Sequence, residues 1–334
     1  MHDLIRPVVV APMAGGPSTP ALVIAAAQAG AVGFLAAGYK TPDLVEAELR
    51  AVRGASVGYG LNLFVPAKPP QDVAAVDRYR RLLQVEADRY GVDLPPVRLR
   101  DDDHFDAKVD LAVTYAPPLV SFTFGVPEKG VVVALQAAGV AVAITVTSAA
   151  EAEQALTVGP EVLIAQGGTA GGHSSTMSPA GYRGNTTAVQ VLAAVRAVTD
   201  LPVIAAGGTG TAADVRELVT AGAVGVQAGT VFLLADEAGT RPAQRAVMQS
   251  QLPHETVVTR AFTGQPARAL RNRFTDEYSE AAPVGYPAVH HLTAPIRAAA
   301  AERGDAGALN LWAGIAHTKA RQASAAEIVA SLIG

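Results

Sequence analysis

Eight short apolar runs recur along the first two thirds of the chain, and most are followed by a helix-like stretch. The runs lack the polar alternation of a strand with one wet face, so they are typical of parallel strands buried on both faces. Eight such strands predict a closed (β/α)8 TIM barrel, an α/β fold, with a doubly wound open sheet as the alternative. We expect the strands at Pro7–Met13, Ala31–Ala37, Tyr59–Val65, Leu119–Phe124, Val140–Val146, Glu161–Gln166, Leu201–Ala206 and Ala223–Ala228.

The chain after the eighth strand is less regular. Residues 236–304 are predicted to form a smaller, mainly helical cap over the C-terminal face of the barrel, to which part of 66–118 could add. The barrel would then comprise 1–235 and 305–334, and the apolar-periodic stretch Ala323–Ile333 could supply its eighth helix.

The region 66–118 separates the third and fourth strands. Within it, Pro70–Tyr90 is predicted to be one long charged helix, and the residues from there to the fourth strand are predicted to be a polar loop.

Composition removes several classes of function. Half of the 334 residues are apolar and the formal charge is only −4, which argues against disorder and gives no general attraction to nucleic acid or to an anionic membrane. The chain has no cysteine, so disulfides, thiolate metal sites, Fe–S clusters and cysteine nucleophiles are excluded. We expect no metal. The charge-poor stretch Ala21–Gly38 is rich in Ala and Gly and reads as a buried helix and strand rather than a membrane span.

The N-terminus has no basic segment followed by an apolar one and a cleavage site. We therefore expect a cytoplasmic protein that acts on a small molecule, without nucleic-acid or membrane partners.

Two glycine-rich loops are candidates for phosphate binding. The segment 205–210 (AAGGTG) follows the seventh strand, and 227–230 (QAGT) follows the eighth. Glycine lets the backbone approach a phosphate closely, and the loops after strands seven and eight are a recurrent phosphate site in barrels. Tight turns that need glycine only for their conformation are the alternative for each loop alone.

A third glycine-rich loop carries a histidine. The segment 166–175 (QGGTAGGHSS) follows the sixth strand and presents His173 at the barrel mouth. A lone histidine is more often structural, but this loop is too glycine-rich to pack as a core element, so we expect His173 to contact substrate or to act in catalysis. The pair His290–His291 lacks a carboxylate at metal-ligand spacing and is expected on the surface or in the cap.

Two further motifs lie on earlier strands. The segment 11–16 (APMAGG) follows the first strand, and Asn62 lies within the third, in GLNLF. An amide in an apolar strand needs polar partners, either neighbouring backbone or the edge of a flat heteroaromatic ring.

Taken in order on successive strands, APMAGG, GLNLF, QGGTAGGH, AAGGTG and QAGT resemble the nitronate monooxygenase family, formerly grouped as 2-nitropropane dioxygenase. The tail segment 310–314 (NLWAG) resembles the family's closing segment. The resemblance implies an FMN-binding TIM barrel with a smaller helical cap. It also implies that His173 is the active-site histidine.

The resemblance and the loops together give the candidate site residues. For cofactor binding they are Met13, Asn62, Gln166, Gly171, Gly207, Gly208, Gln227, Ala228, Gly229, Thr230, Trp312 and Gly314. Weaker candidates for substrate contact are Thr123, Ser174 and Tyr278. Thr123 lies in SFTFG, where members similar to this chain often carry a second histidine, and a threonine cannot serve as a cationic anchor.

The implied reaction takes an alkyl nitronate, such as propionate 3-nitronate, and O2 to a carbonyl compound and nitrite, with FMN carrying the redox step. An FMN-dependent enoyl-thioester reductase that uses NAD(P)H is the first alternative. A flavin-binding protein without catalysis is the second. An IMP dehydrogenase-like barrel would need a nucleophilic cysteine, which this chain lacks.

Overall fold

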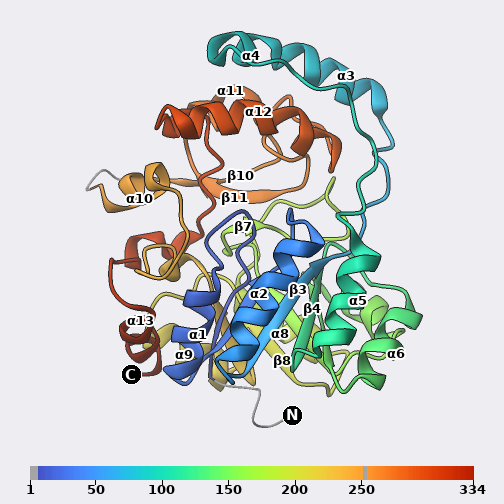
Figure 1. The fold of residues 1–334 in the computed structure, drawn as a ribbon, viewed down its shortest axis with the longest axis vertical. Coiled ribbons are helices and arrows are strands. Elements are labelled where there is room, and N and C mark those ends of the chain that lie inside the picture. Colours follow the sequence, from blue (N-terminus) through green and yellow to red (C-terminus); the bar gives the residue numbers. More distant parts are fainter. Residues whose placement is uncertain (1–6, 251–253) are drawn as a thin grey trace.

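The computed structural model describes residues 7–250 and 254–334, and its central feature is a closed barrel of eight parallel strands (Figure 1). Residues 1–6, part of the segment considered for a targeting signal, lie outside the described residues. The barrel strands, in their order around the barrel, are β1 (Val8–Val10), β2 (Val32–Ala36), β3 (Tyr59–Phe64), β4 (Leu119–Thr123), β5 (Ala141–Val146), β6 (Val162–Gln166), β8 (Val203–Ala206) and β9 (Gly225–Ala228).

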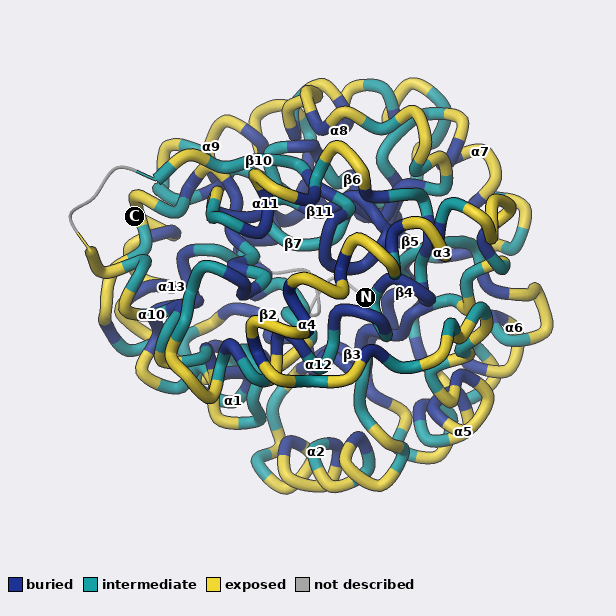
Figure 2. The backbone as a smooth tube through the Cα atoms, turned by 90° about the horizontal axis from the view of Figure 1, so that it is seen from above, coloured by how far each residue is buried: buried dark blue, intermediate teal, exposed yellow. Residues whose placement is uncertain are grey.

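Closure comes from β1, which pairs in parallel with β2 on one side and with β9 on the other. The inward side chains are apolar and fully buried, among them Val9, Phe34 and Ile204. Figure 2 shows the buried strands near the centre and the exposed outer faces of the helices around them. The predicted barrel is confirmed, and every predicted strand is present, although each is shorter than expected.

Helices cover the outside of the barrel. Those between successive strands are α1 (Pro20–Gln28), α2 (Pro42–Gly54), α5 (Phe105–Tyr115), α6 (Lys129–Ala137), α7 (Ala149–Leu156), α8 (Ala188–Arg196) and α9 (Ala212–Thr220). The C-terminal helix α13 (Ala325–Ile333) contacts both α1 and α9 and so fills the eighth position, as the apolar periodicity predicted. Within the described residues, no helix is both long and apolar enough to cross a membrane.

Two expectations for the region between β3 and β4 were wrong. The expected single helix is two, α3 (Val73–Leu82) and α4 (Gln84–Tyr90), interrupted at Leu83. The expected loop contains α5, in which Phe105, Val109 and Ala112 recur at helical spacing and are buried against the barrel. The acidic run just before α5 concealed this short apolar face.

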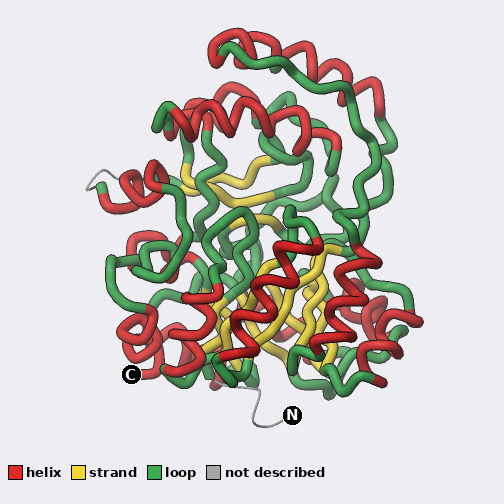
Figure 3. The backbone as a smooth tube through the Cα atoms, in the orientation of Figure 1, coloured by secondary structure: helices red, strands yellow, loops and turns green. Residues whose placement is uncertain are grey.

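A second layer lies above the carboxyl ends of the barrel strands, with strands of its own (Figure 3). Its helices are α10 (Pro242–Gln249), α11 (Arg273–Tyr278) and α12 (Ala288–Glu302). Its sheet is antiparallel and joins β10 (Thr256–Thr259), β11 (Ala267–Leu270) and β7 (Gly172–His173). This sheet was not predicted, because its strands have only two to four residues and show no periodicity.

We propose that this layer and the arm formed by α3 and α4 make up the cap. Side chains of α3, α4, α11 and α12 share one hydrophobic cluster. Leu309, Leu311 and Ala313 are buried in the same cluster, so the cap extends beyond the expected boundary at residue 304 and ends near Gly314.

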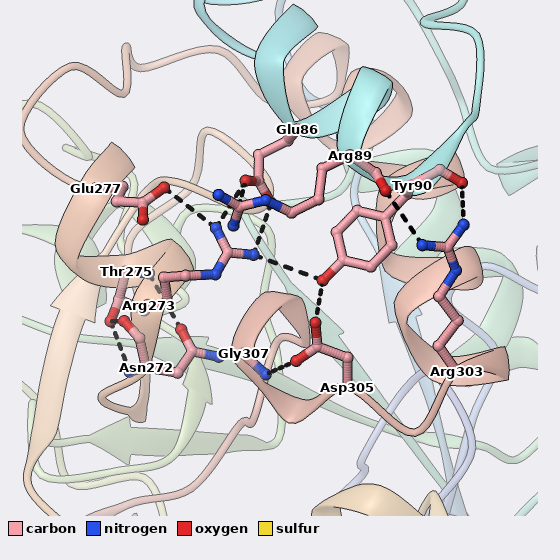
Figure 4. Close-up of polar contacts among 10 residues, drawn as sticks. All are labelled: Glu86, Arg89, Tyr90, Asn272, Arg273, Thr275, Glu277, Arg303, Asp305 and Gly307. Carbon is pink, nitrogen blue, oxygen red and sulfur yellow. Dashed lines mark hydrogen bonds and ion pairs between the residues drawn. The ribbon is translucent and has the colours of Figure 1, made fainter.

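The arm is fastened to the rest of the cap by an ion pair whose carboxylate is buried (Figure 4). The Glu86 carboxylate of α4 is completely buried and accepts hydrogen bonds from both terminal nitrogens of Arg273, at 2.6 and 2.8 Å. Nearby, the Tyr90 hydroxyl donates to Asp305 at 2.5 Å, and Arg303 donates to the Tyr90 carbonyl at 2.7 Å. These contacts join α4 to α11 and to the end of α12.

We predict that Arg273→Ala loosens the arm. Removing one partner of a buried ion pair costs on the order of 3 kcal/mol, and the cost here is smaller because Arg273 is partly exposed and Arg89 stays 3.0 Å from the Glu86 carboxylate. Hydrogen exchange of the α3 and α4 amides should therefore become much faster, while exchange in the barrel strands is unchanged. The control is Arg271→Ala, because Arg271 is half-exposed and pairs with Asp276 at the surface, where such pairs contribute little. Equal protection of α3 and α4 in the two variants would contradict this account.

Candidate active site

A large cavity opens at the carboxyl ends of the barrel strands, beneath the cap. It holds about 1360 Å3 including its open mouth, and its walls come from the loops after the barrel strands and from cap residues. Most sequence-predicted residues line it: Met13, Asn62, Thr123, Gln166, Gly171, His173, Gly207, Gly208, Gln227, Ala228, Gly229, Thr230 and Trp312. The structure thus brings together residues that are distant in the sequence.

The two glycine loops present bare backbone to the cavity. Gly207 and Gly208, directly after β8, have φ values of +115° and +80°, which side chains rarely adopt. A Cβ on Gly208 would lie 3.0 Å from the Thr169 hydroxyl, and one on Gly229 would lie 3.2 Å from the Ala11 side chain. A side chain at either position would therefore crowd neighbouring residues of this wall.

Polar side chains beside these loops have unused hydrogen-bonding capacity. The Gln227 Oε1 and Thr209 Oγ1 atoms are buried, and neither has a partner among the described residues. Buried polar atoms rarely stay unpaired, so these two indicate a polar ligand.

The side-chain amides of Asn62 and Gln166 are hydrogen-bonded to different extents within the protein. The Asn62 amide nitrogen donates to Ser121 Oγ at 2.9 Å and to Thr123 Oγ1 at 3.0 Å, which orients the side chain across β4. Gln166 accepts from the Ser175 amide at 2.7 Å and donates to the His173 carbonyl at 3.1 Å. Gln166 therefore holds the loop that carries His173.

His173 lies in β7, where it pairs with Ala267 of β11 and is thereby fixed to the cap sheet. Its Nε2 is 2.9 Å from the Thr263 hydroxyl, which itself donates to the Gln265 carbonyl at 3.2 Å. The Thr263 oxygen then accepts the Nε2 proton, and Nδ1 keeps a lone pair. Burial and the nearby Arg297 charge lower the pKa of His173 to about 3, so the ring is neutral at neutral pH.

The wall of the cavity carries little charge. Among the described residues that line it, Arg241 alone has a full charge at neutral pH, and its one side-chain hydrogen bond goes to Asn310 Oδ1 at 3.2 Å. Thr123 accepts a hydrogen bond from Asn62, so the barrel side of the cavity is polar but uncharged.

Three sequence-predicted residues do not line this cavity. Tyr278 is buried in the cap with its ring 4.6 Å from Phe274, so we withdraw it as a substrate residue. Ser174 is buried, and its carbonyl accepts from Gln265 at 3.1 Å. Gly314 lies behind the wall: its amide donates to Thr230 Oγ1 at 2.9 Å, and a Cβ there would clash with the Thr169 carbonyl.

Sequence reasoning missed several residues at the site. Tyr39 follows β2 and lines the cavity, and its position after a barrel strand could have indicated it. Arg241 reaches the cavity from the cap, where no local pattern marked it, and Asn310 does so from the NLWAG segment, of which only Trp312 and Gly314 were expected at the site. His290, expected on the surface or in the cap, stacks on Tyr39 with ring centroids 4.3 Å apart.

Comparison with known proteins agrees with this architecture. The family model described as nitronate monooxygenase matches residues 1–334. The chain belongs to the nitronate monooxygenase family. This is a family of flavin-dependent oxidoreductases. The chain is 32% identical over 318 residues to a probable nitronate monooxygenase of Staphylococcus aureus strain Newman, covering 94% of this chain and 89% of the relative. A Staphylococcus saprophyticus relative with the same name is 34% identical, with 92% and 88% covered.

Solved structures show the same fold. A nitroalkane oxidase from Streptomyces ansochromogenes is 41% identical and superposes with a TM-score of 0.94, covering 99% of this chain and 96% of that one. FabK from Thermotoga maritima superposes with a TM-score of 0.72 at 22% identity, covering 99% and 93%, and this likeness shows the fold alone.

The buried histidines predict a stability that falls in mild acid. The pKa of His173 is lowered to about 3 and burial also lowers the pKa of His290, so the unfolded chain binds protons below pH 6.5 that the folded chain does not. The free energy of unfolding should decrease by up to about 1.4 kcal/mol per pH unit for each such histidine. Urea unfolding between pH 7.5 and 5.5 should show this decrease, with a shallower slope in His173→Asn. The exposed His104→Asn variant is the control, and equal slopes in all three proteins would refute the prediction.

Proposed function

We propose that this protein binds FMN in the cavity and uses it to oxidise alkyl nitronates with O2, yielding a carbonyl compound and nitrite. The observation that carries the proposal is the juxtaposition of His173 with two bare glycine loops and two unpartnered buried polar atoms in one cavity. The family supports it, as does the 41% identity to the nitroalkane oxidase.

The chemical character of the residues that line the cavity fits FMN. Gly207, Gly208 and Gly229 would admit the phosphate to the backbone, and Thr230 would line the same end of the cavity. The Gln227 and Thr209 oxygens, which lack partners, would accept or share hydrogen bonds with the cofactor. When bound, FMN supplies the electron-accepting chemistry that the side chains lack.

His173 suits the task of moving a proton. A neutral imidazole with a free lone pair on Nδ1 can accept the α-proton of a neutral nitroalkane and so produce the nitronate inside the cavity. The resulting anion lies beside the ring and favours its protonated form, which offsets the low pKa of the neutral imidazole. A preformed nitronate needs no such step.

The enoyl-thioester reductase alternative shares the barrel but needs a nicotinamide donor. The FabK likeness, at 22% identity, does not favour this activity. NADH added without oxygen should leave the flavin of this protein oxidised. Rapid bleaching would favour the reductase, and bound flavin without nitronate turnover would favour a non-catalytic flavoprotein.

We predict that the released cofactor has the mass of FMN and that Gly208→Asp abolishes its binding. A carboxylate beside the phosphate adds like-charge repulsion and occupies the space that the glycine leaves. The variant should fold but be purified colourless. The matched control is Gly91→Asp, which also has a positive φ, +65°, but opens onto free space and should stay yellow. FAD, no flavin, or a fully yellow Gly208→Asp would overturn this assignment.

We predict that His173→Asn retains flavin and fold but loses activity. With a neutral nitroalkane, kcat/KM should fall by about 100-fold or more because the proton acceptor is gone. With a preformed nitronate the loss should be smaller. Oxygen uptake and nitrite release measure both, with His104→Asn as the matched control. A His173→Asn enzyme within about threefold of wild type on the nitroalkane would remove this residue from the mechanism.

A further inference from the structure

Tyr39 lines the cavity, but the proposed function gives its hydroxyl no role. It follows β2 with a φ of +67°, a backbone conformation that is unusual for a residue other than glycine. Its hydroxyl oxygen is buried beside the Tyr286 hydroxyl but makes no well-aligned hydrogen bond with any of the described residues. The ring is held between Phe64, with centroids 5.4 Å apart, and His290, which is stacked nearly parallel at 4.3 Å. A hydroxyl fixed so firmly and left unpaired indicates a ligand that pairs with it.

A buried cation lies behind this stack. Arg297 of α12 is only 7% exposed, and it donates to Thr293 Oγ1 at 3.1 Å and to the His290 carbonyl at 2.9 Å. No carboxylate of the described residues pairs with it. Burial lowers the pKa of Arg297 to about 10, so the group remains charged at neutral pH. A buried charge without a counter-ion is costly, and an anion bound nearby would reduce that cost.

Arg297 also determines which ring nitrogen of His290 carries the proton. Its guanidinium can only donate, so the 3.3 Å contact with His290 Nδ1 makes that nitrogen an acceptor and leaves the ring proton on Nε2. Burial, followed by the Arg297 charge, lowers the pKa of His290, so this ring stays neutral. Burial raises the pKa of Tyr39, which keeps its hydroxyl protonated and able to donate. The Asp103 carboxylate accepts from the Tyr39 backbone amide at 3.0 Å, but the Arg297 charge acts on the Tyr39 hydroxyl more strongly than Asp103 or Asp101 does, so the hydroxyl donates in a field dominated by Arg297.

Arg241 adds to this field. It lines the cavity, and its charge contributes to lowering the pKa of Arg297, so the two guanidinium groups lie within electrostatic range of each other. Tyr39 follows β2, whereas the glycine loops follow β8 and β9, so the hydroxyl occupies a different sector of the rim from the expected phosphate.

We propose that the Tyr39 hydroxyl, held against His290 and backed by the buried Arg297, binds the two-oxygen anionic group of the substrate and selects it over neutral molecules of the same shape. Tyr39 is the specificity residue that contacts the anion, and Arg297 is a positioning residue that acts through His290 and through its charge. This assignment deepens the proposed function, on which it rests for the identity of the anion as a nitronate. It also explains how a site with a neutral His173, and with Thr123 in the SFTFG motif, attracts an anion.

The test compares an anion with its neutral isostere. Propionate has a planar two-oxygen anionic group like a nitronate, and propionamide has the same shape without charge. Isothermal titration calorimetry of the flavin-loaded protein at pH 7.5 gives the ratio of the two dissociation constants. Tyr39→Phe should weaken propionate binding about tenfold or more and change propionamide binding less than twofold, because a hydrogen bond to a charged group is lost.

Three further variants separate the roles. Tyr59→Phe removes a hydroxyl at the amino end of β3, away from the cavity, and should leave both constants unchanged. Arg297→Lys keeps the charge and should retain the preference for propionate, whereas Arg297→Met should lose it, with thermal unfolding confirming that both fold. A general loss of packing would weaken both ligands equally and leave the ratio unchanged.

The outcomes distinguish this proposal from the proposed function. If wild type shows no preference for propionate, or if Tyr39→Phe retains it, the anion site is wrong even where nitronates are oxidised. If the preference depends on Tyr39 but no nitronate drives oxygen uptake, the anion site stands and the proposed function fails. Should Arg297→Met prove unfolded, the Tyr39→Phe ratio alone decides.

Discussion

The parallel pairing of β1 with β9, with Val8 opposite Val226 and Val10 opposite Ala228, closes the barrel and determines where the chemistry can lie. Because all eight strands run in the same direction, the residue after each strand reaches the same rim. The interior below that rim is filled by apolar side chains such as Phe34 and Ile204, so polar groups gather only at the mouth. Met13 and Gln227 meet at one cavity for this reason.

The rim and the cap contribute different chemistry. The rim supplies bare backbone and neutral amides or hydroxyls, which suit a cofactor held by many weak contacts. The cap supplies Arg241 at the wall and Arg297 behind it, and it carries the partner strand that fixes His173. Docking of the cap therefore sets the charge of the site. The Glu86–Arg273 pair contributes at a distance, because it secures the arm that shares the cap's hydrophobic cluster.

What could be predicted from the sequence was encoded locally. The strands are continuous apolar runs and the loops are rich in glycine, so the barrel and most of the cavity wall were recognisable. The position of Tyr39 after a strand was recognisable too, but its stacking on His290 and the contact of His290 with Arg297 were not, because they depend on how the cap lies over the rim, which no local pattern records. Tyr278 was misplaced for the same reason: an aromatic residue of the cap faces the cap's own core rather than the cavity. The short strands of the cap sheet were likewise too brief to show periodicity.

The buried Arg297 charge links the two tasks of the site. Burial lowers the pKa of His173 most and the Arg297 charge lowers it further, which keeps the ring neutral and ready to accept a proton. The same positive charge favours an anion beside Tyr39. A second cationic histidine on the rim would be repelled by this field, whereas the threonine at position 123 only accepts a hydrogen bond from Asn62 and adds no charge. A buried arginine in the cap can thus attract the anion without a second histidine on the rim. The anion is attracted from above, and the proton acceptor beside it starts uncharged.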